Sequence, residues 1–169
     1  AAPAILRAKK SADIRIKDMS IGYEDYTYRT PIKFGGSVVD KVTILNVNVV
    51  VETAGGKSQK GFGSMPLGNV WAFPSKVLSY QDTLNAMKTL AERIHKITLN
   101  YKEIAHPVDI NVALEPSYLK AAAELKLAQP MPKLCAIVTA SPFDAAIHDA
   151  FGKLHNRSSW NTYGPDLMS

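Results

Sequence analysis

Residues 45–65 read LNVNVVVETAGGKSQKGFGSM and predict a β-hairpin. Apolar residues occupy alternate positions in the first half of this stretch, namely Leu45, Val47, Val49 and Val51. A period of two with β-branched residues is typical of a strand that is buried on one face. The glycine-rich run at 54–57 (AGGK) supplies the turn, because glycine tolerates positive φ. Residues 58–65 are the returning strand, in which Phe62 lies between two glycines, and glycine in a strand often marks a bulge or a close approach of another backbone.

A further strand is predicted at residues 13–23, before the hairpin. Ile14 and Ile16 point to one face, and the apolar residues from Met19 onward have the opposite parity. This change of parity indicates a bulge or bend near Asp18. The first third of the chain is therefore predicted to be a three-stranded antiparallel β-meander.

The connection between these two strands, residues 24–36, is predicted to be a long loop. It is longer than a hairpin needs, and loops of about 12 residues or more are often functional. Its aromatic and basic side chains are candidates for contacting a ligand: Tyr26, Tyr28, Arg29, Lys33 and Phe34. An equally weighted alternative is a surface loop whose rings pack on the rest of the domain.

Three helices are predicted after the strands. The first follows a capping sequence, Ser79 to Asp82, and has apolar residues at three- and four-residue spacing. The second is predicted at 116–127, with a proline in its first turn, and the third at 141–154, with Ser-Pro as N-cap and first position. The third helix has one apolar stripe, made of Phe143, Ala146, Ile147, Ala150, Phe151 and Leu154. Strands followed by helices indicate an α+β fold, a three-stranded antiparallel β-meander followed by a helical bundle.

The composition is that of an ordinary globular domain. The chain has 169 residues, of which 46% are hydrophobic and 21% charged. This length suits one domain and is too short for a complete (β/α)₈ barrel, which needs about 250 residues. No apolar run is long enough to cross a membrane. The net charge of +5 is spread along the chain, so we expect no nucleic-acid partner.

The single cysteine, Cys135, lies in an apolar run and is expected to be a buried structural thiol. It excludes an intramolecular disulfide, and with no visible signal peptide we expect a cytoplasmic location. The chain begins Ala1-Ala2-Pro3 and stops in a turn-like segment at 164–169, so both ends read as cuts.

A search for catalytic patterns identifies no activity from the residues themselves. There is no glycine-rich phosphate loop and no nucleophile elbow. Asp144 and His148 are four residues apart on a predicted helix and could begin a metal site, but no third ligand shares their face. His95 and His106 belong to no motif. We therefore predict no catalytic residue and no metal ligand in this chain.

Several motifs taken in order resemble the N-terminal capping domain of the enolase superfamily, in its mandelate racemase/muconate lactonizing enzyme branch. The meander resembles that branch from Thr30-Pro31 through Gly35-Gly36, Val47 to Thr53, Gly55-Gly56 and Gly61-Phe62-Gly63. The segment AIHDAFGKLHN at 146–156 resembles the helix written ALWDLxGKxxG in that branch, and 161–164 matches the entry to its barrel. Two positions differ: Ser64 stands where the branch has a hairpin glutamate, and His148 where it has tryptophan.

The resemblance implies the domain limits of the chain and which domain of the parent enzyme carries the catalytic groups. It implies a tail at 1–12, a capping domain at 13–164, and the start of a link to a missing barrel domain at 165–169. In such enzymes the barrel holds three acidic Mg²⁺ ligands and the acid/base residues, and Mg²⁺ stabilises an enediolate after proton abstraction next to a carboxylate. The chain itself is then expected to hold no cofactor, to be inactive alone, and to have its own barrel and, in the parent enzyme, a carboxylate substrate as partners.

The resemblance also implies which residues face the substrate. The stretch from Tyr23 to Gly36 is the expected substrate-capping loop. A second capping region is expected at the end of the hairpin, with Phe62, Ser64 and Met65. The implied parent is a Mg²⁺-dependent acid-sugar dehydratase, racemase, epimerase or cycloisomerase, and a homo-oligomer is possible.

Two other function classes remain open on the sequence. One is a standalone α+β binding module that uses the Tyr/Arg/Lys segment for a small acidic ligand or a protein partner. The other is a basic nucleic-acid binder, which the scattered charges disfavour.

Overall fold

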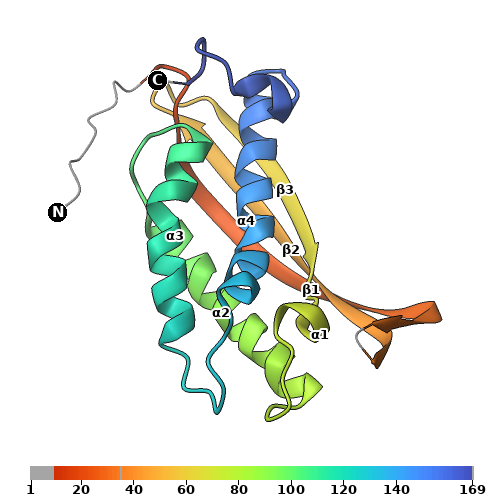
Figure 1. The fold of residues 1–169 in the computed structure, drawn as a ribbon. Coiled ribbons are helices and arrows are strands. Elements are labelled where there is room, and N and C mark those ends of the chain that lie inside the picture. The colour runs from red at the N-terminus through yellow and green to blue at the C-terminus, as the bar shows by residue number, and fades with distance from the viewer. Residues whose placement is uncertain (1–9, 35, 169) are drawn as a thin grey trace.

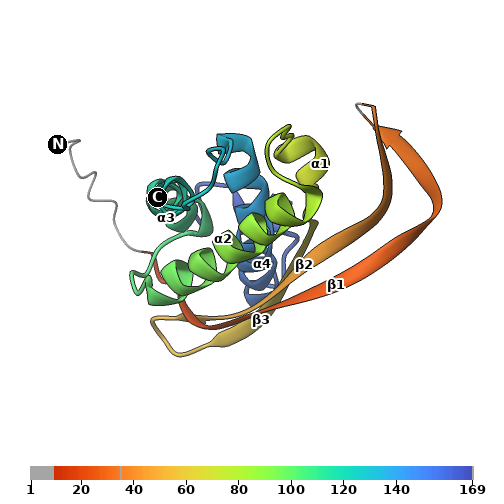
Figure 2. The ribbon, with the colours of Figure 1, turned by 90° about the horizontal axis from the view of Figure 1, so that it is seen from below.

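The computed structural model describes residues 10–34 and 36–168. Three strands form one antiparallel sheet in the order β1-β2-β3: β1 (Ile14–Phe34), β2 (Ser37–Thr53) and β3 (Ser58–Pro66). The helices follow as α1 (Asn69–Ala72), α2 (Tyr80–Asn100), α3 (Pro107–Ala123) and α4 (Lys133–Leu154), and then the short 3-10 helix η1 (Ser159–Thr162). The helices cover one face of the sheet (Figures 1 and 2). The predicted α+β meander followed by helices is confirmed.

The predicted hairpin and bulge are confirmed in the strand register. Gly56 has φ +83° in the turn between β2 and β3, and the Thr53 N–H donates to the Lys57 carbonyl at 2.9 Å. Between β1 and β2 the pairing shifts from Ile16 to Asp18, which leaves Lys17 unpaired as the bulge. This bulge keeps the apolar residues on both of its sides facing the helices.

The prediction of a loop at residues 24–36 is wrong. β1 continues to Phe34 and pairs with β2 from Ser37 onward, so the two strands form a long ribbon. The ribbon projects past the helical layer (Figure 2). Its side chains are mostly exposed on both faces, so it has no one-sided burial and lacks the period of two that identifies strands.

Two helix starts were also predicted wrongly, both because of an internal proline. α3 begins at Pro107 rather than Pro116, and α4 begins at Lys133 rather than Ser141. Proline removes one helical hydrogen bond, and its ring crowds the preceding turn. Here burial of Pro142 and of the neighbouring apolar stripe outweighs that cost. The predicted capping box at Ser79 is confirmed, since its side chain and that of Asp82 bond reciprocally to each other's backbone N–H.

Two glycines let α4 lie directly on β3. A Cβ at Gly61 would lie 2.2 Å from the Ala146 carbonyl oxygen, and a Cβ at Gly63 would lie 2.0 Å from that of Pro142. No real side chain fits at these distances, so the glycines are required by the close approach of helix and strand. The close approach that glycine in a strand indicates is confirmed.

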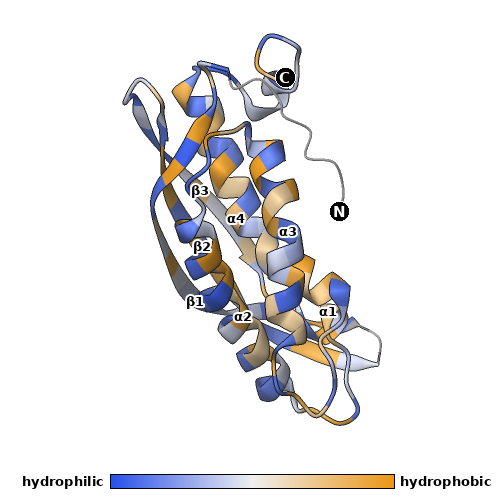
Figure 3. Cartoon of the chain, turned by 90° about the vertical axis from the view of Figure 1, so that its left-hand side faces the viewer, coloured by the Kyte–Doolittle hydropathy of each residue, from blue (hydrophilic) through white to orange (hydrophobic). Residues whose placement is uncertain are grey.

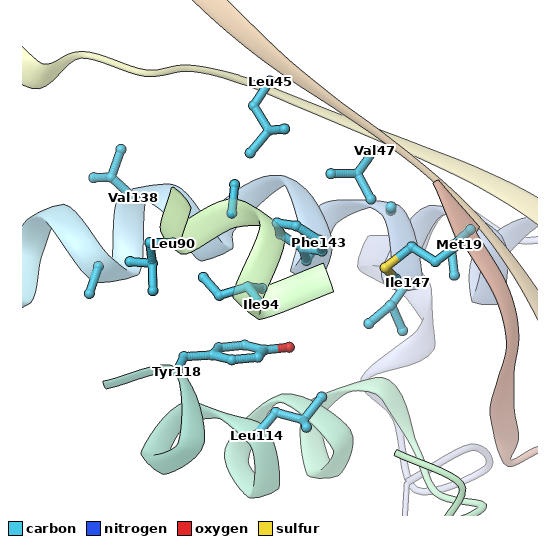
Figure 4. Packing of buried hydrophobic residues seen from close by; sticks show 14 of the residues in the cluster. Met19, Leu45, Val47, Leu90, Ile94, Leu114, Tyr118, Val138, Phe143 and Ile147 are labelled. Carbon is cyan, nitrogen blue, oxygen red and sulfur yellow. The ribbon is translucent and has the colours of Figure 1, made fainter. Parts of the chain in front are cut away.

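The core lies between the sheet and the helices. Figure 4 shows Leu45 and Val47 from the sheet against Leu90, Ile94, Phe143 and Ile147 from α2 and α4. All members of the predicted α4 stripe are buried. Figure 3 shows hydrophobic and hydrophilic residues in alternating bands along the strands. The free Cys135 is buried as predicted, and burial raises the pKa of its thiol to about 12.

The outer face of the sheet is polar. The Glu52 carboxylate accepts hydrogen bonds from Arg15, Lys17 and Ser58. The bonds from Lys17 and Arg15 lower the pKa of Glu52 to about 2. This face is therefore solvated, in contrast to the face that packs on the helices.

The predicted domain limits remain predictions. Residues 1–9 of the expected tail and Ser169 lie outside the described residues. At the other end, 165–168 form a turn in which the Leu167 N–H donates to the Gly164 carbonyl. Among the described residues, no helix is both long and apolar enough to cross a bilayer.

Candidate functional site

The candidate site is the ribbon formed by residues 27–34 and 37–42, together with the surface that faces it. After the pair Thr27–Lys41 the next pair is Ile32–Val39, so residues 28–31 of β1 lie opposite Asp40 alone. This large bulge pushes Tyr28, Arg29 and their neighbours out of the regular ladder. Bulges of this kind turn side chains in new directions and are frequent near active sites.

The ribbon leaves apolar side chains in solvent. Tyr26 is 48% exposed, Ile32 is 54% exposed and Val38 is 65% exposed. An isolated two-stranded ribbon is only marginally stable in water, because it has no layer to pack against. The exposed side chains are therefore available to a partner or ligand that covers the ribbon.

A cleft separates the end of the ribbon from α1 and the start of α2. Its volume is about 730 Å³, and Ser37 and Val38 of the ribbon line one side. The opposite side includes Trp71, which is 41% exposed, and Tyr80. A smaller cavity of about 160 Å³ at the base of the ribbon brings Tyr28 and Ile32 to the same two rings. The site therefore combines aromatic walls from three elements.

Charges of both signs lie at the base of the ribbon. The Lys41 ammonium lies 5.5 Å from the centroid of the Tyr80 ring, a cation–π contact. Burial raises the pKa of Tyr80, and the nearby carboxylates of Asp25 and Asp40 raise it further. The phenol of Tyr80 therefore stays neutral at physiological pH and can donate a hydrogen bond.

Only some of the residues predicted for the substrate-capping loop lie at this site. Tyr28 lines the smaller cavity at the base of the ribbon, and Arg29 and Lys33 are exposed on the ribbon. The Tyr26 hydroxyl donates to Glu24 on the outer face, and this hydrogen bond raises the pKa of Tyr26. The side chain of Phe34 lies outside the described residues.

Tyr23 belongs to the body rather than to the ribbon. Its hydroxyl donates to the Lys88 carbonyl at 3.2 Å, and the Lys88 ammonium lies 5.0 Å from its ring centroid. Burial raises the pKa of Tyr23 to about 12. These contacts with α2 hold the first strand of the ribbon to the helical layer.

The structure does not bring the second predicted region to the ribbon end as a unit. Phe62 and Ser64 lie on the outer face of the sheet, where the Ser64 hydroxyl donates to Asn46 Oδ1 at 2.8 Å. Met65 has the opposite orientation and packs against the core. None of the three lines the smaller cavity, although Pro66, the residue after Met65, does.

Sequence reasoning missed Trp71, Tyr80, Lys41 and the aliphatic side chains of the ribbon. The available signal was a tryptophan, Trp71, three residues after Gly68 and close to the end of the predicted hairpin. The sequence has no signal for the pairing of the two ribbon strands. This pairing places Val38 across the cleft from Trp71.

The described residues do not offer a magnesium site. No group of three or more His, Cys, Asp or Glu side chains within 10–34 and 36–168 lies close enough to hold a metal ion. The predicted pair of Asp144 and His148 forms an internal contact, with His148 Nδ1 at 2.9 Å from Asp144 Oδ1. This geometry uses the carboxylate for the imidazole rather than for a cation in a ligand cage.

Comparison with solved structures places the fold. An enolase from an alphaproteobacterium (bal199), solved with bound Mg, matches with TM-score 0.55 and 15% identity over 85% of this chain and 32% of its own. An enolase from Bradyrhizobium, complexed with magnesium and mandelic acid, matches with TM-score 0.51 and 17% identity over 85% and 33%. The chain has the fold of the N-terminal region of enolase-superfamily proteins.

L-Talarate/galactarate dehydratase from Salmonella typhimurium LT2 has the same fold in this region, with TM-score 0.50 and 17% identity over 90% of this chain and 34% of the dehydratase. The chain thus spans about a third of the length of these enolase-superfamily structures. No protein-family model matches the sequence, and no curated protein matches it either.

Proposed function

We propose that this chain is the capping domain of a Mg²⁺-dependent enolase-superfamily enzyme. In this proposal the ribbon end covers the substrate in a barrel domain, and the barrel carries the Mg²⁺ and the catalytic acids and bases. The observation that carries the proposal is the exposed ribbon, which projects beyond the helices (Figure 2) and lines an open cleft together with Trp71 and Tyr80. The enolase-superfamily fold supports it, since the matched structures are about three times as long as this chain.

The ribbon has the chemistry that a cap over an anionic substrate needs. Arg29 and Lys33 place positive charge on exposed positions of the ribbon. Positive charge beside a cleft raises the local concentration of a carboxylate and speeds its arrival. Tyr28, Trp71 and Tyr80 supply apolar surface that excludes water when the cap closes, and water exclusion strengthens the electrostatic interactions inside the site.

The reaction of the parent enzyme is proposed as proton abstraction next to a carboxylate. Acid-sugar dehydration, racemisation, epimerisation and cycloisomerisation all begin in this way. The fold neighbours include L-talarate dehydratases solved with L-glucarate, so acid sugars are the first substrates to test. A cytoplasmic location, the pairing with a barrel domain and a homo-oligomer are parts of the same proposal.

Activity of the chain with and without its barrel tests the proposal. We expect no turnover of galactarate, L-talarate or L-glucarate by the 169 residues alone, and turnover with Mg²⁺ when they are joined to the barrel of the parent gene. In the joined protein, Arg29→Ala or Tyr28→Ala should lower kcat/KM by about tenfold or more, as when a substrate contact is lost. Lys60→Ala, on the outer face of β3, is the matched control and should leave kcat/KM unchanged.

Three results would contradict the proposal. One is turnover by the 169 residues alone, and another is tight Mg²⁺ binding by them. The third is a joined protein whose kcat/KM is insensitive to changes on the ribbon.

A second candidate is a standalone module for a small acidic ligand or a protein partner. The cleft favours it, because Lys76 and the rings of Trp71 and Tyr80 line one concave surface. Saturable binding of a dicarboxylate to the isolated chain, abolished by Lys76→Ala, would support this module over the cap.

A further inference from the structure

A separate cavity lies between α3 and α4, away from the ribbon. Its volume is about 450 Å³, within the range of small-molecule sites. Val112 of α3 and Ile137 of α4 line it, and they are 68% and 44% exposed. Two large aliphatic side chains thus flank a hollow that the described residues leave unfilled.

One end of the cavity carries a carboxylate in a fixed position. Asp144 Oδ1 accepts a hydrogen bond from the side-chain amide of Asn111 and lies 2.9 Å from His148 Nδ1, which itself bonds to the Asp144 carbonyl oxygen at 3.1 Å. Asp144 Oδ2 receives no hydrogen bond from the described residues, and the Asp144 side chain is 53% exposed. A carboxylate that is held on one oxygen and open on the other is ready to accept from a ligand.

The charge at this end is not balanced by a lysine or arginine. The other carboxylate of the cavity, Glu115, has Lys133 at 3.6 Å, whereas Asp144 has no such partner among the described residues. The Tyr163 ring lines the same end, with its centroid 5.8 Å from that of His148. A carboxylate beside an accessible aromatic ring is the environment that organic ammonium groups prefer.

His148 holds the carboxylate in place. Its Nε2 is buried and has no hydrogen-bond partner among the described residues. A proton on Nε2 would therefore be a buried donor without an acceptor, which is costly, so the neutral ring carries its proton on Nδ1. That N–H donates to the Asp144 carbonyl oxygen at 3.1 Å and lies beside the carboxylate, 2.9 Å from Oδ1. Burial lowers the pKa of His148, and the hydrogen bonds that the ring donates to Asp144 raise it, with a net upward direction. An alkaline buffer therefore favours the neutral ring, so that an imidazolium does not compete with a ligand cation for the carboxylate.

We propose that the groove between α3 and α4 binds a small organic cation. The ammonium group lies against Asp144 Oδ2 and the Tyr163 ring, and the apolar body lies over Val112 and Ile137. Asp144 is the binding residue and His148 is a positioning residue. The proposal goes beyond the capping role, and it stands or falls independently of that role because it uses none of the ribbon residues.

Calorimetry and ligand-observed NMR at pH 8.5 test this site with three phenyl compounds of similar size. We expect saturable binding of 2-phenylethylammonium, and binding at least about tenfold weaker for neutral 2-phenylethanol and anionic 3-phenylpropanoate. Asp144→Asn should weaken the cation by about tenfold. Asp149→Asn is the matched control, because Asp149 lies on the same helix but pairs with Lys153 and the Phe62 N–H, outside the groove.

A second variant keeps the test independent of the fold around Asp144. Val112→Lys, at an exposed position, should abolish cation binding while the circular dichroism and thermal unfolding of the chain stay unchanged. The proposal is overturned if 2-phenylethylammonium does not saturate, if the anion binds as well as the cation, or if Asp149→Asn weakens binding as much as Asp144→Asn. A dimer that Val112→Lys dissociates would also overturn it, since a second copy would then fill the groove.

Discussion

Strands β1 and β2 run through both the body of the molecule, where the helices cover the sheet, and the ribbon. The two regions differ in how far their side chains are buried. Between Ile14 and Tyr23 the inner side chains of β1 pack on α2 or on the core. In the ribbon the same strand projects past the helical layer (Figure 2), and its side chains at 29–33 are exposed. The comparison shows that the fold is specified by one-sided burial, whereas the candidate site is left free of that constraint.

Truncation of a core side chain should give the largest effect. Phe143 is fully buried, so Phe143→Ala is expected to lower the free energy of unfolding by about 3–5 kcal/mol. Ile32→Ala on the ribbon removes a side chain that is 54% exposed and should cost less than about 0.5 kcal/mol. Urea unfolding followed by circular dichroism measures both. Similar losses for the two variants would break the distinction between body and ribbon.

The contact between β3 and α4 should be almost as sensitive. Gly63→Ala forces a methyl group against the Pro142 carbonyl, so we expect a loss of about 1–3 kcal/mol or more in unfolding free energy. Gly22→Ala is the control on β1, because no atom lies within 4 Å of the added Cβ. The same urea titration applies. Equal stability of the two alanine variants would show that α4 does not lie as close to β3 as described.

The N-cap of α2 should contribute a smaller amount. The Ser79 hydroxyl accepts from the Asp82 N–H at 3.1 Å, and Ser79→Ala should lower the free energy of unfolding by about 1 kcal/mol. Ser79→Asp retains an acceptor and should recover most of this loss. If the alanine and aspartate variants unfold at the same urea concentration, the cap does not stabilise the helix.

The outer face of the sheet should show the smallest effect, and only as a dependence on pH. Lys17 and Arg15 lower the pKa of Glu52 to about 2 from the ordinary glutamate value of 4.5. The unfolded chain thus binds a proton to Glu52 at higher pH than the folded chain does. The stabilisation is complete above about pH 4.5 and is lost as the pH falls toward 2.

The stability of Glu52→Gln relative to the parent chain measures this loss. The difference between the two proteins should be constant near neutral pH and shrink between pH 4.5 and 2. If the difference in unfolding free energy does not change between pH 4.5 and 2, the ion pairs on the outer face do not stabilise the fold.

The body could be predicted from the sequence because its signals are local and mutually consistent. The alternation from Leu45 to Val51, the glycine turn and the capping box each act over a few residues, and each is confirmed. The bulge at Asp18 was predicted from parity alone. These features depend on burial of one face, which leaves a periodic pattern in the sequence.

The ribbon and the starts of α3 and α4 could not be predicted in the same way. Most side chains at 24–33 face solvent, whichever side of the ribbon they lie on, so their pairing leaves no alternation to find. Pro116 and Pro142 gave the local signal of a helix start, and only the packing of the complete molecule places them inside α3 and α4. The cleft could not be predicted from the sequence either, for a related reason. Val38 and Trp71 come together only through the path of the ribbon.

Hydrogen exchange of the ribbon amides tests the capping proposal most directly. The measurement compares the chain alone with the chain joined to the barrel of its parent gene, with Mg²⁺ and an acid-sugar substrate present. If the ribbon covers the substrate, amides at 27–34 and 37–42 should exchange at least about tenfold more slowly in the joined, substrate-bound protein, because their local opening is suppressed. Core amides of β2 at 45–51 should be slow in both. Ribbon amides that exchange equally fast in the two proteins would contradict the capping function.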